Sequence, residues 1–284
     1  MRANFGTAAI VVAMEPEATP VSPPIQLRIA DDIRMKIERG DLQPGDPLPT
    51  LHELTTEWDC SVTSARNAIT LLKQQGLISG GRGKAPVVRR PRRRVVRDSA
   101  RHQAEKDFAL EPESVRRHHG EAEDDLGDSL HNLKFRSDYS IQAASPELAA
   151  VFACEPGDQL LRKEYETSDP SGIRLAYSVA YVPVRLIEAK PELLSADCEP
   201  WPGGGQHQFM TVGIEIARMV DEVRTFMPTT VDMQLWALDD GVPMLCVRRI
   251  SIDTKDRVVE ISDAHYPGDS TELRFTTPLT PWKG

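Results

Sequence analysis

The sequence predicts an α+β protein of two domains, a winged helix-turn-helix followed by a domain built on an antiparallel sheet. Three observations support this prediction. Residues 25–88 contain three helix patterns and then two short β runs around a glycine-rich tip, and residues after 137 form β hairpins. The charge of the two parts also has opposite sign. A length of 284 residues is ample for two buried cores.

The net charge of −9 is unevenly distributed along the chain. Residues 23–97 carry a balance of +6, whereas residues 98–284 carry −14. Eight basic residues and no acidic residue lie between Ile78 and Arg97. A negative whole-chain charge argues against a nucleic-acid partner, but the positive charge of residues 23–97 favours one. We therefore expect a small basic binding domain joined to a larger acidic domain.

The first predicted helix spans Ile25–Arg39. Its isoleucines recur at every fourth position, and Gly40 follows as a left-handed cap. Thr50 and Glu53 have the capping-box spacing, so a second helix should begin at Leu51 and end near Trp58.

A third helix is predicted from Ser61, which is a good N-cap residue, to about Gln75. Two short strands, 77–78 and 87–88, then flank a basic glycine-rich tip.

This order of elements indicates that the third helix enters the major groove of DNA by its N-terminal end. Val62, Thr63 and Ser64 would then face bases or phosphates, with Arg66 one turn further along. Arg82 and Lys84 at the wing tip would reach the DNA backbone or minor groove. The alternative, a small helical bundle with a solvated surface, explains neither the wing glycines nor the local charge.

The region Ile25–Val88 resembles the DNA-binding domain of GntR-type bacterial transcription regulators. The matching motifs are Gly40–Pro49, Glu53-Leu54, Thr63–Ile69, Leu71–Ile78 and the Gly81-Arg82-Gly83 wing. The resemblance implies that Thr50, His52 and Gly83 also lie at the DNA. His52 stands where the family commonly has a DNA-contacting arginine, and Val62 stands where it often has another. These departures make the family's usual operator an unsafe guide.

The predicted linker spans residues 91–130, basic at first and then polar. Its arginines, with Arg89 and Arg90 before them, are interpreted both as a solvated hinge and as an arm that follows phosphates beside the wing. His118 and His119 lie beside carboxylates but lack further spaced ligands, so no metal site is predicted.

Residues 131–280 are predicted to form the second domain. A helix opens at Ser145-Pro146, and the runs 160–167 and 174–182 form a hairpin around Asp169–Gly172. A short helix is expected over 233–238, followed by strands 243–253 and 258–266.

These elements resemble the UTRA effector-binding domain that follows the winged helix in the HutC subfamily of GntR regulators. The matching motifs include Glu155–Asp158, Tyr181–Pro183, Arg224–Thr229 and Gly241–Pro243. UTRA domains resemble chorismate lyase in fold but act as receptors for small metabolites. The resemblance therefore implies a chorismate-lyase-like antiparallel sheet with an effector pocket. It also implies pocket roles for four residues, namely Arg162, Tyr181, Glu260 and Tyr266.

Other features set limits on the class of protein. The four cysteines are far apart, which favours free thiols in a reducing compartment. Residues 1–22 are interpreted as a disordered leader, because their apolar run is too short to cross a bilayer. We expect a cytoplasmic protein without cofactor or membrane partner.

The leading functional hypothesis is a homodimeric transcription regulator, most often a repressor, that binds double-stranded operator DNA and responds to a small-molecule effector. One alternative is a lyase-type enzyme in the second domain, although no nucleophile–base pair stands out there. Another is a DNA-binding repressor whose second domain serves only dimerisation.

Overall fold

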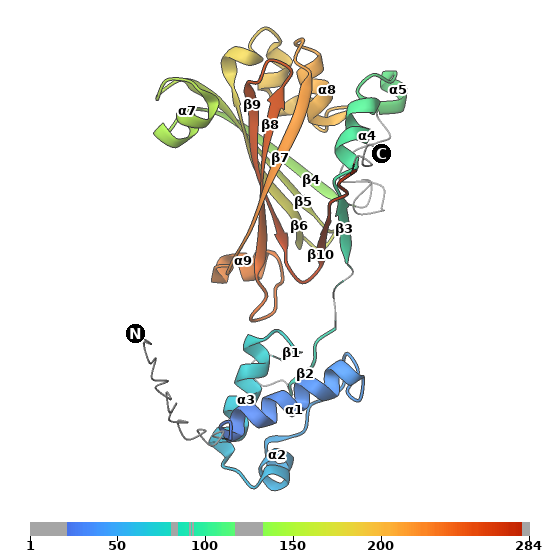
Figure 1. The fold of residues 1–284 in the computed structure, drawn as a ribbon, viewed down its shortest axis with the longest axis vertical. Coiled ribbons are helices and arrows are strands. Elements are labelled where there is room, and N and C mark those ends of the chain that lie inside the picture. The colour runs from blue at the N-terminus through green and yellow to red at the C-terminus, as the bar shows by residue number, and fades with distance from the viewer. Residues whose placement is uncertain (1–21, 81–84, 91, 93, 117–132, 280–284) are drawn as a thin grey trace, which may run out of the picture.

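The computed structural model describes residues 22–80, 85–90, 92, 94–116 and 133–279. A small helical domain at the N-terminal end is joined by an extended segment to a larger domain built on a twisted sheet (Figure 1). Within the described part of the chain, no helix has the length and apolar character needed to cross a membrane.

The N-terminal domain is the predicted winged helix-turn-helix. Its helices are α1 (Ile25–Arg39), α2 (Leu51–Trp58) and α3 (Val62–Gln74), and its wing strands are β1 (Ile78–Ser79) and β2 (Val87–Val88). The capping box at Thr50 and the left-handed cap at Gly40 are both present. The predicted bounds of these helices and wing strands are therefore confirmed to within a residue or two.

The core of this domain explains why the three helices hold together. Ile29 and Ile33 on the inner face of α1 are fully buried against Ala65, Ala68 and Leu72 of α3. The small alanines of α3 allow the two helices to approach closely, and the apolar spacing of both helices follows the helical period.

The C-terminal domain contains a six-stranded sheet in which all neighbouring strands are antiparallel. The strand order is β4-β5-β6-β9-β8-β7. The strands are β4 (Lys134–Ala143), β5 (Gln159–Ser168), β6 (Arg174–Pro183), β7 (Ile216–Phe226), β8 (Met244–Asp253) and β9 (Val258–Pro267). The predicted hairpin is confirmed as β5–β6, and the two further strands expected over 243–253 and 258–266 are confirmed as β8 and β9, which pair with each other.

Helices cover both faces of this sheet. Helix α7 (Pro146–Phe152) packs on Leu160, whereas Phe209 of α8 (Gly204–Met210) packs near Leu161. Successive residues of a strand point to opposite faces, so α7 and α8 lie on opposite sides. Three 3-10 helices, Val184–Leu186, Pro191–Leu194 and Ala196–Cys198, connect β6 to α8.

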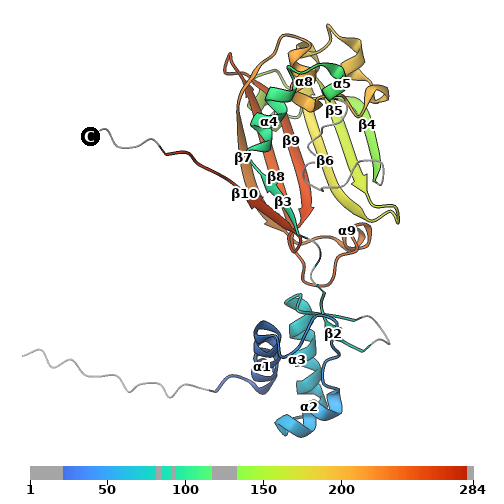
Figure 2. The same cartoon turned by 90° about the vertical axis from the view of Figure 1, so that its right-hand side faces the viewer.

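The expected linker contains regular structure that the sequence analysis missed. Strand β3 (Val95–Asp98) pairs in parallel with β10 (Thr271–Arg274), and α4 (Arg101–Phe108) and α5 (Glu113–Arg116) follow. Helices α4 and α5 lie with α8 over the same face of the sheet (Figure 2). The reason for the miss is that α4 is strongly polar and its residues are at most partly buried, so it carries little apolar periodicity. The pair His118-His119 lies outside the described residues.

One helix is shifted from its predicted place. Helix α9 spans Thr230–Leu235 rather than 233–238, because Thr229 and Asp232 form a capping box that starts the helix earlier.

Candidate DNA-binding surface and effector pocket

The N-terminal end of α3 presents a polar and exposed surface. Ser61 caps the helix, since its hydroxyl accepts a hydrogen bond from the Ser64 amide at 3.1 Å. Val62 is 50% exposed, and Thr63 and Arg66 are also exposed. The cap directs the first turn of α3 away from the core, so these side chains are free to meet another molecule.

Helix α2 supports this surface through its own cap. The Thr50 amide donates to the Glu53 carboxylate at 2.7 Å, and the Glu53 amide donates to the Thr50 hydroxyl at 3.2 Å. The hydrogen bonds that the Glu53 carboxylate accepts from the Thr50 amide and hydroxyl lower the pKa of Glu53. His52 follows the cap and is exposed. Six of the predicted DNA-contacting residues thus lie at or near the starts of two adjacent helices, namely Thr50, His52, Val62, Thr63, Ser64 and Arg66. The three predicted wing residues, Arg82, Gly83 and Lys84, lie outside the described residues.

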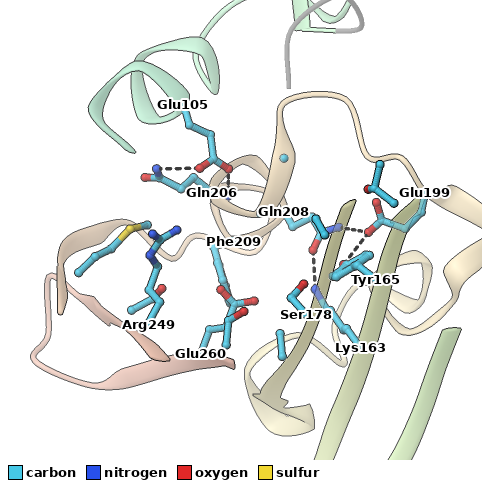
Figure 3. A pocket seen from close by; sticks show the side chains of 18 of the residues that line it. Glu105, Lys163, Tyr165, Ser178, Glu199, Gln206, Gln208, Phe209, Arg249 and Glu260 are labelled. Carbon is cyan, nitrogen blue, oxygen red and sulfur yellow. Dashed lines mark hydrogen bonds between the residues drawn. The ribbon is translucent and has the colours of Figure 1, made fainter. Parts of the chain in front are cut away.

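A pocket of about 300 Å³ lies between the sheet and the helices α4 and α8 (Figure 3). Its lining combines ionisable, hydroxyl-bearing and aromatic side chains. The ionisable and hydroxyl-bearing ones are Arg97, Glu105, Lys163, Tyr165, Thr167, Tyr177, Ser178, Glu199, Arg249, Ser251, Glu260, Ser262 and Tyr266. The volume is at the lower end of the range for small-molecule sites.

One end of the pocket is organised around the carboxylate of Glu199. Its Oε1 atom accepts hydrogen bonds from the Tyr139 hydroxyl, from the Tyr165 hydroxyl at 3.0 Å and from Gln208 Nε2 at 2.7 Å. Burial, together with the negative charge of Glu199, raises the pKa of Tyr139 and of Tyr165. Both phenols therefore stay protonated and hold this end of the pocket rigid.

Lys163 is the most deeply buried cation of the pocket lining, with 3% of the residue exposed. Its Nζ atom donates to Gln208 Oε1 at 2.5 Å (Figure 3). Burial lowers the pKa of Lys163, while the carboxylates of Glu260 and Glu199 act in the opposite direction. The acidic groups in the pocket therefore offset only part of the cost of burying this charge.

One polar group of the pocket lining is left without a partner among the residues that the structure describes. The Ser251 hydroxyl is buried and makes no hydrogen bond to any of them. Arg249, two residues earlier on β8, forms two hydrogen bonds with the carboxylate of Asp221 at 2.9 and 3.0 Å. A buried hydroxyl without a partner is costly, and a bound molecule would satisfy it.

The segment after the DNA-binding domain forms a wall of the pocket. Glu105 on α4 accepts hydrogen bonds from the backbone amide of Gln206 at 3.1 Å and from Gln206 Nε2 at 3.2 Å (Figure 3). Gln206 Nε2 also donates to the His102 carbonyl at 2.7 Å. Arg97 on β3 lies over the ring of Tyr266, 3.8 Å from its centroid. The segment that follows the DNA-binding domain in the chain therefore lines the pocket directly.

The structure brings only part of the predicted effector site together. Glu260 and Tyr266 line the pocket, but Arg162 and Tyr181 do not belong to its lining. These two residues face each other across β5 and β6, and Arg162 forms an ion pair with Glu164 at 2.7 Å. The neighbouring pair Lys163 and Ala180 lines the pocket instead, because side chains alternate along a strand.

Several lining residues were missed by the sequence analysis. Lys163, Tyr165 and Thr167 alternate along β5, a pattern that does signal a polar inner face. Arg249 and Ser251 repeat this alternation on β8, whereas Glu199 lies in a loop and carried no such signal. No group of three or more metal-ligating side chains occurs among the residues that the structure describes.

Two family models match the chain and cover most of both domains. The family "Bacterial regulatory proteins, gntR family" matches residues 25–88, and the UTRA domain matches residues 139–272.

Relatives extend over nearly the whole chain at low identity. An HTH-type transcriptional regulator of Rhizobium meliloti is 24% identical over 88% of this chain and 93% of its own length. The HTH-type transcriptional repressor NagR of Bacillus subtilis is 22% identical over 87% of this chain and 91% of its own. PhnF of Mycolicibacterium smegmatis, also an HTH-type transcriptional repressor, has the same identity and coverage.

A crystal structure of a GntR-family transcriptional regulator shares the fold, with a TM-score of 0.67, 21% identity and coverage of 91% of this chain and 99% of that chain. A winged helix joined to a sheet domain that encloses a polar pocket defines a ligand-responsive transcription regulator. The chain belongs to the GntR family and carries a UTRA effector-binding domain, the arrangement of the HutC subfamily. The members of this family are transcription regulators.

Proposed function

We propose that this protein is a repressor that binds a palindromic operator as a homodimer and loses or gains operator affinity when a small molecule occupies the UTRA pocket. The observation that carries the proposal is that the linker after the DNA-binding domain forms one wall of the effector pocket. Arg97 and Glu105 line the pocket, and they lie in the segment that leads directly from the wing. Two similar proteins are named repressors, which supports the sign of the regulation.

For DNA recognition we propose that α3 enters the major groove with Val62, Thr63, Ser64 and Arg66. Thr50 and His52 would contact the adjacent backbone, and Arg82, Gly83 and Lys84 would contact DNA from the wing. Val62 can pack on a thymine methyl group, and its 50% exposure is in keeping with that role. The domain units we propose are residues 23–90 for DNA binding and 131–280 for effector binding and dimerisation.

For the effector site we propose direct contacts from Glu260, Tyr266 and the unpartnered hydroxyl of Ser251. The charge of the pocket lining is mixed, with three cations and three acidic groups (Arg97, Lys163, Arg249, Glu105, Glu199 and Glu260). A cytoplasmic location follows from a DNA partner, and it suits four cysteines that are all free.

The test begins with two independent selections. Random-sequence duplexes retained by the protein would define the operator, and a thermal-shift screen of metabolites would define the effector. The identified effector should then change operator affinity in a gel-shift assay by about 5- to 150-fold. Sedimentation at several protein concentrations would measure the dimer. An effector that binds without any change in operator affinity would contradict the proposal.

A further inference from the structure

Arg89, the first residue after wing strand β2, is bound by the effector domain. Its Nε atom donates to the Asp239 carboxylate at 2.7 Å, and its guanidinium also forms an ion pair with Asp269. The side chains of Arg89 and Asp269 are each 12% exposed. Both carboxylates come from loops of the effector domain, one after α9 and one between β9 and β10.

A second arginine strengthens the same contact. Arg92 donates hydrogen bonds to the carbonyls of Trp236, at 3.0 Å, and of Ala237 at the end of α9. It also lies 3.7 Å from Asp269. Burial, together with repulsion from Arg89, lowers the pKa of Arg92. Two arginines of a segment expected to follow DNA phosphates are therefore occupied within the protein.

The backbone of the two domains also meets at this point. A side chain at Gly241 would collide with the Gln74 carbonyl at the C-terminal end of α3. Because this end of the recognition helix lies against the effector domain, the exposed N-terminal end of α3 remains free for DNA.

We propose that Arg89, Asp239 and Asp269 form an interdomain latch that fixes the orientation of the DNA-binding domain on the effector domain. Arg89 is then a positioning residue of the regulator and does not contact the DNA backbone. In a dimer, the orientation of the two domains decides whether both recognition helices fit their half-sites at once. This consequence at the operator rests on the proposed function, but the latch itself does not.

The latch lies close to the pocket along the chain. Tyr266, which lines the pocket beneath Arg97, comes three residues before Asp269. The Val95 amide of β3 donates to the Ser270 carbonyl at 2.7 Å, directly beside Asp269. A ligand that contacts Tyr266 or Arg97 would therefore bind within a few residues of the turn that holds Arg89.

Limited proteolysis with trypsin tests the latch without DNA or ligand. Trypsin cleaves after arginine, so Arg89 and Arg92 are themselves cleavage sites, and substitution of their acidic partners leaves these sites intact. The double variant Asp239→Asn/Asp269→Asn should be cleaved after Arg89 and Arg92 about tenfold faster than wild type, equivalent to about 1.4 kcal/mol of opening. Mass spectrometry of the fragments identifies the positions of cleavage.

The control is Asp240→Asn, which removes the same charge from an exposed residue of the same loop. It should be cleaved at the wild-type rate. Far-UV circular dichroism verifies that the double variant is folded. In a second measurement, raising the salt from about 50 mM to about 500 mM should narrow the difference between wild type and double variant, because salt screens ion pairs.

Equal cleavage rates for wild type, the control and the folded double variant would overturn the latch. The alternative role of Arg89 has its own readout. Binding of Arg89→Gln to a random-sequence duplex should keep the wild-type salt dependence. A decrease in the slope by about one would assign Arg89 to a DNA phosphate instead.

Discussion

The guanidinium of Arg97 lies over the ring of Tyr266, 3.8 Å from its centroid, and both residues are buried in the wall of the effector pocket. Arg97 belongs to β3 in the linker, whereas Tyr266 is near the end of β9 in the sheet. This contact joins the segment that leads to the DNA-binding domain to the strand that carries Glu260.

A double-mutant cycle should measure this contact. Arg97→Met and Tyr266→Leu should show a coupling free energy of about 1 kcal/mol in urea unfolding, because a desolvated cation over an aromatic ring contributes about 0.5–2 kcal/mol. Tyr266→Phe keeps the ring and is the matched control, so a cycle of Arg97→Met with Tyr266→Phe should show a coupling free energy near zero. Additive effects of Arg97→Met and Tyr266→Leu would contradict the interaction.

Gly241 offers a backbone test of the contact between the domains. Gly241→Ala should speed tryptic cleavage after Arg89, because a methyl group there meets the Gln74 carbonyl. Gly172→Ala is the control, since Gly172 also has a positive φ (+93° against +80°) but has no neighbour within 4 Å of an added methyl group. Both variants carry the same kind of backbone strain. If they are cleaved at equal rates, the close approach at Gly241 is not what holds the domains together.

The DNA-binding domain could be predicted almost completely from the sequence, because its signals are local. The caps at Thr50 and Ser61 and the period of the isoleucines fix the helices without reference to the rest of the chain. The pocket was only partly predictable. Glu260 and Tyr266 were identified by resemblance. Arg162 was predicted in place of its neighbour Lys163, and because successive residues of a strand face opposite sides of the sheet, Arg162 lies on the face away from the pocket.

Contacts between distant segments were not predictable. The pairing of β3 with β10 and the ion pairs of Arg89 join residues more than 140 positions apart, and nothing in the local sequence of an arginine-rich run indicates its partners.

Arg66 tests the orientation of the recognition helix. Arg66→Ala should weaken operator binding by about 1–3 kcal/mol, enough to abolish the shift in a gel assay at moderate protein concentration. Arg39→Ala removes an exposed arginine from the end of α1 and should leave the shift unchanged. Wild-type operator affinity in the Arg66 variant would mean that α3 does not enter the groove by its N-terminal end.

Arg93 tests the prediction that part of the linker follows phosphates. This residue lies outside the described residues, so the prediction rests on the basic run alone. Arg93→Ala should weaken binding to any duplex modestly and reduce the salt slope by about one. The Arg89→Gln variant is the natural comparison, because the latch predicts an unchanged slope for it. An unchanged slope in both variants would confine the phosphate contacts to other residues.

Lys163 should make the stability of the effector domain depend on pH. Burial lowers its pKa from 10.5, so between the lowered pKa and 10.5 the unfolded chain binds a proton that the folded chain does not. Stability therefore rises with pH in that window and is lowest below it. Lys163→Met lacks this titration, so the free energy of unfolding of wild type minus that of the variant should increase as the pH is raised toward 10. Urea unfolding at a series of pH values gives this difference. Lys255→Met, at an exposed turn, should show no such trend. A difference for Lys163→Met that stays flat or falls with pH would show that the lysine is charged throughout and fully compensated by Glu199 and Glu260.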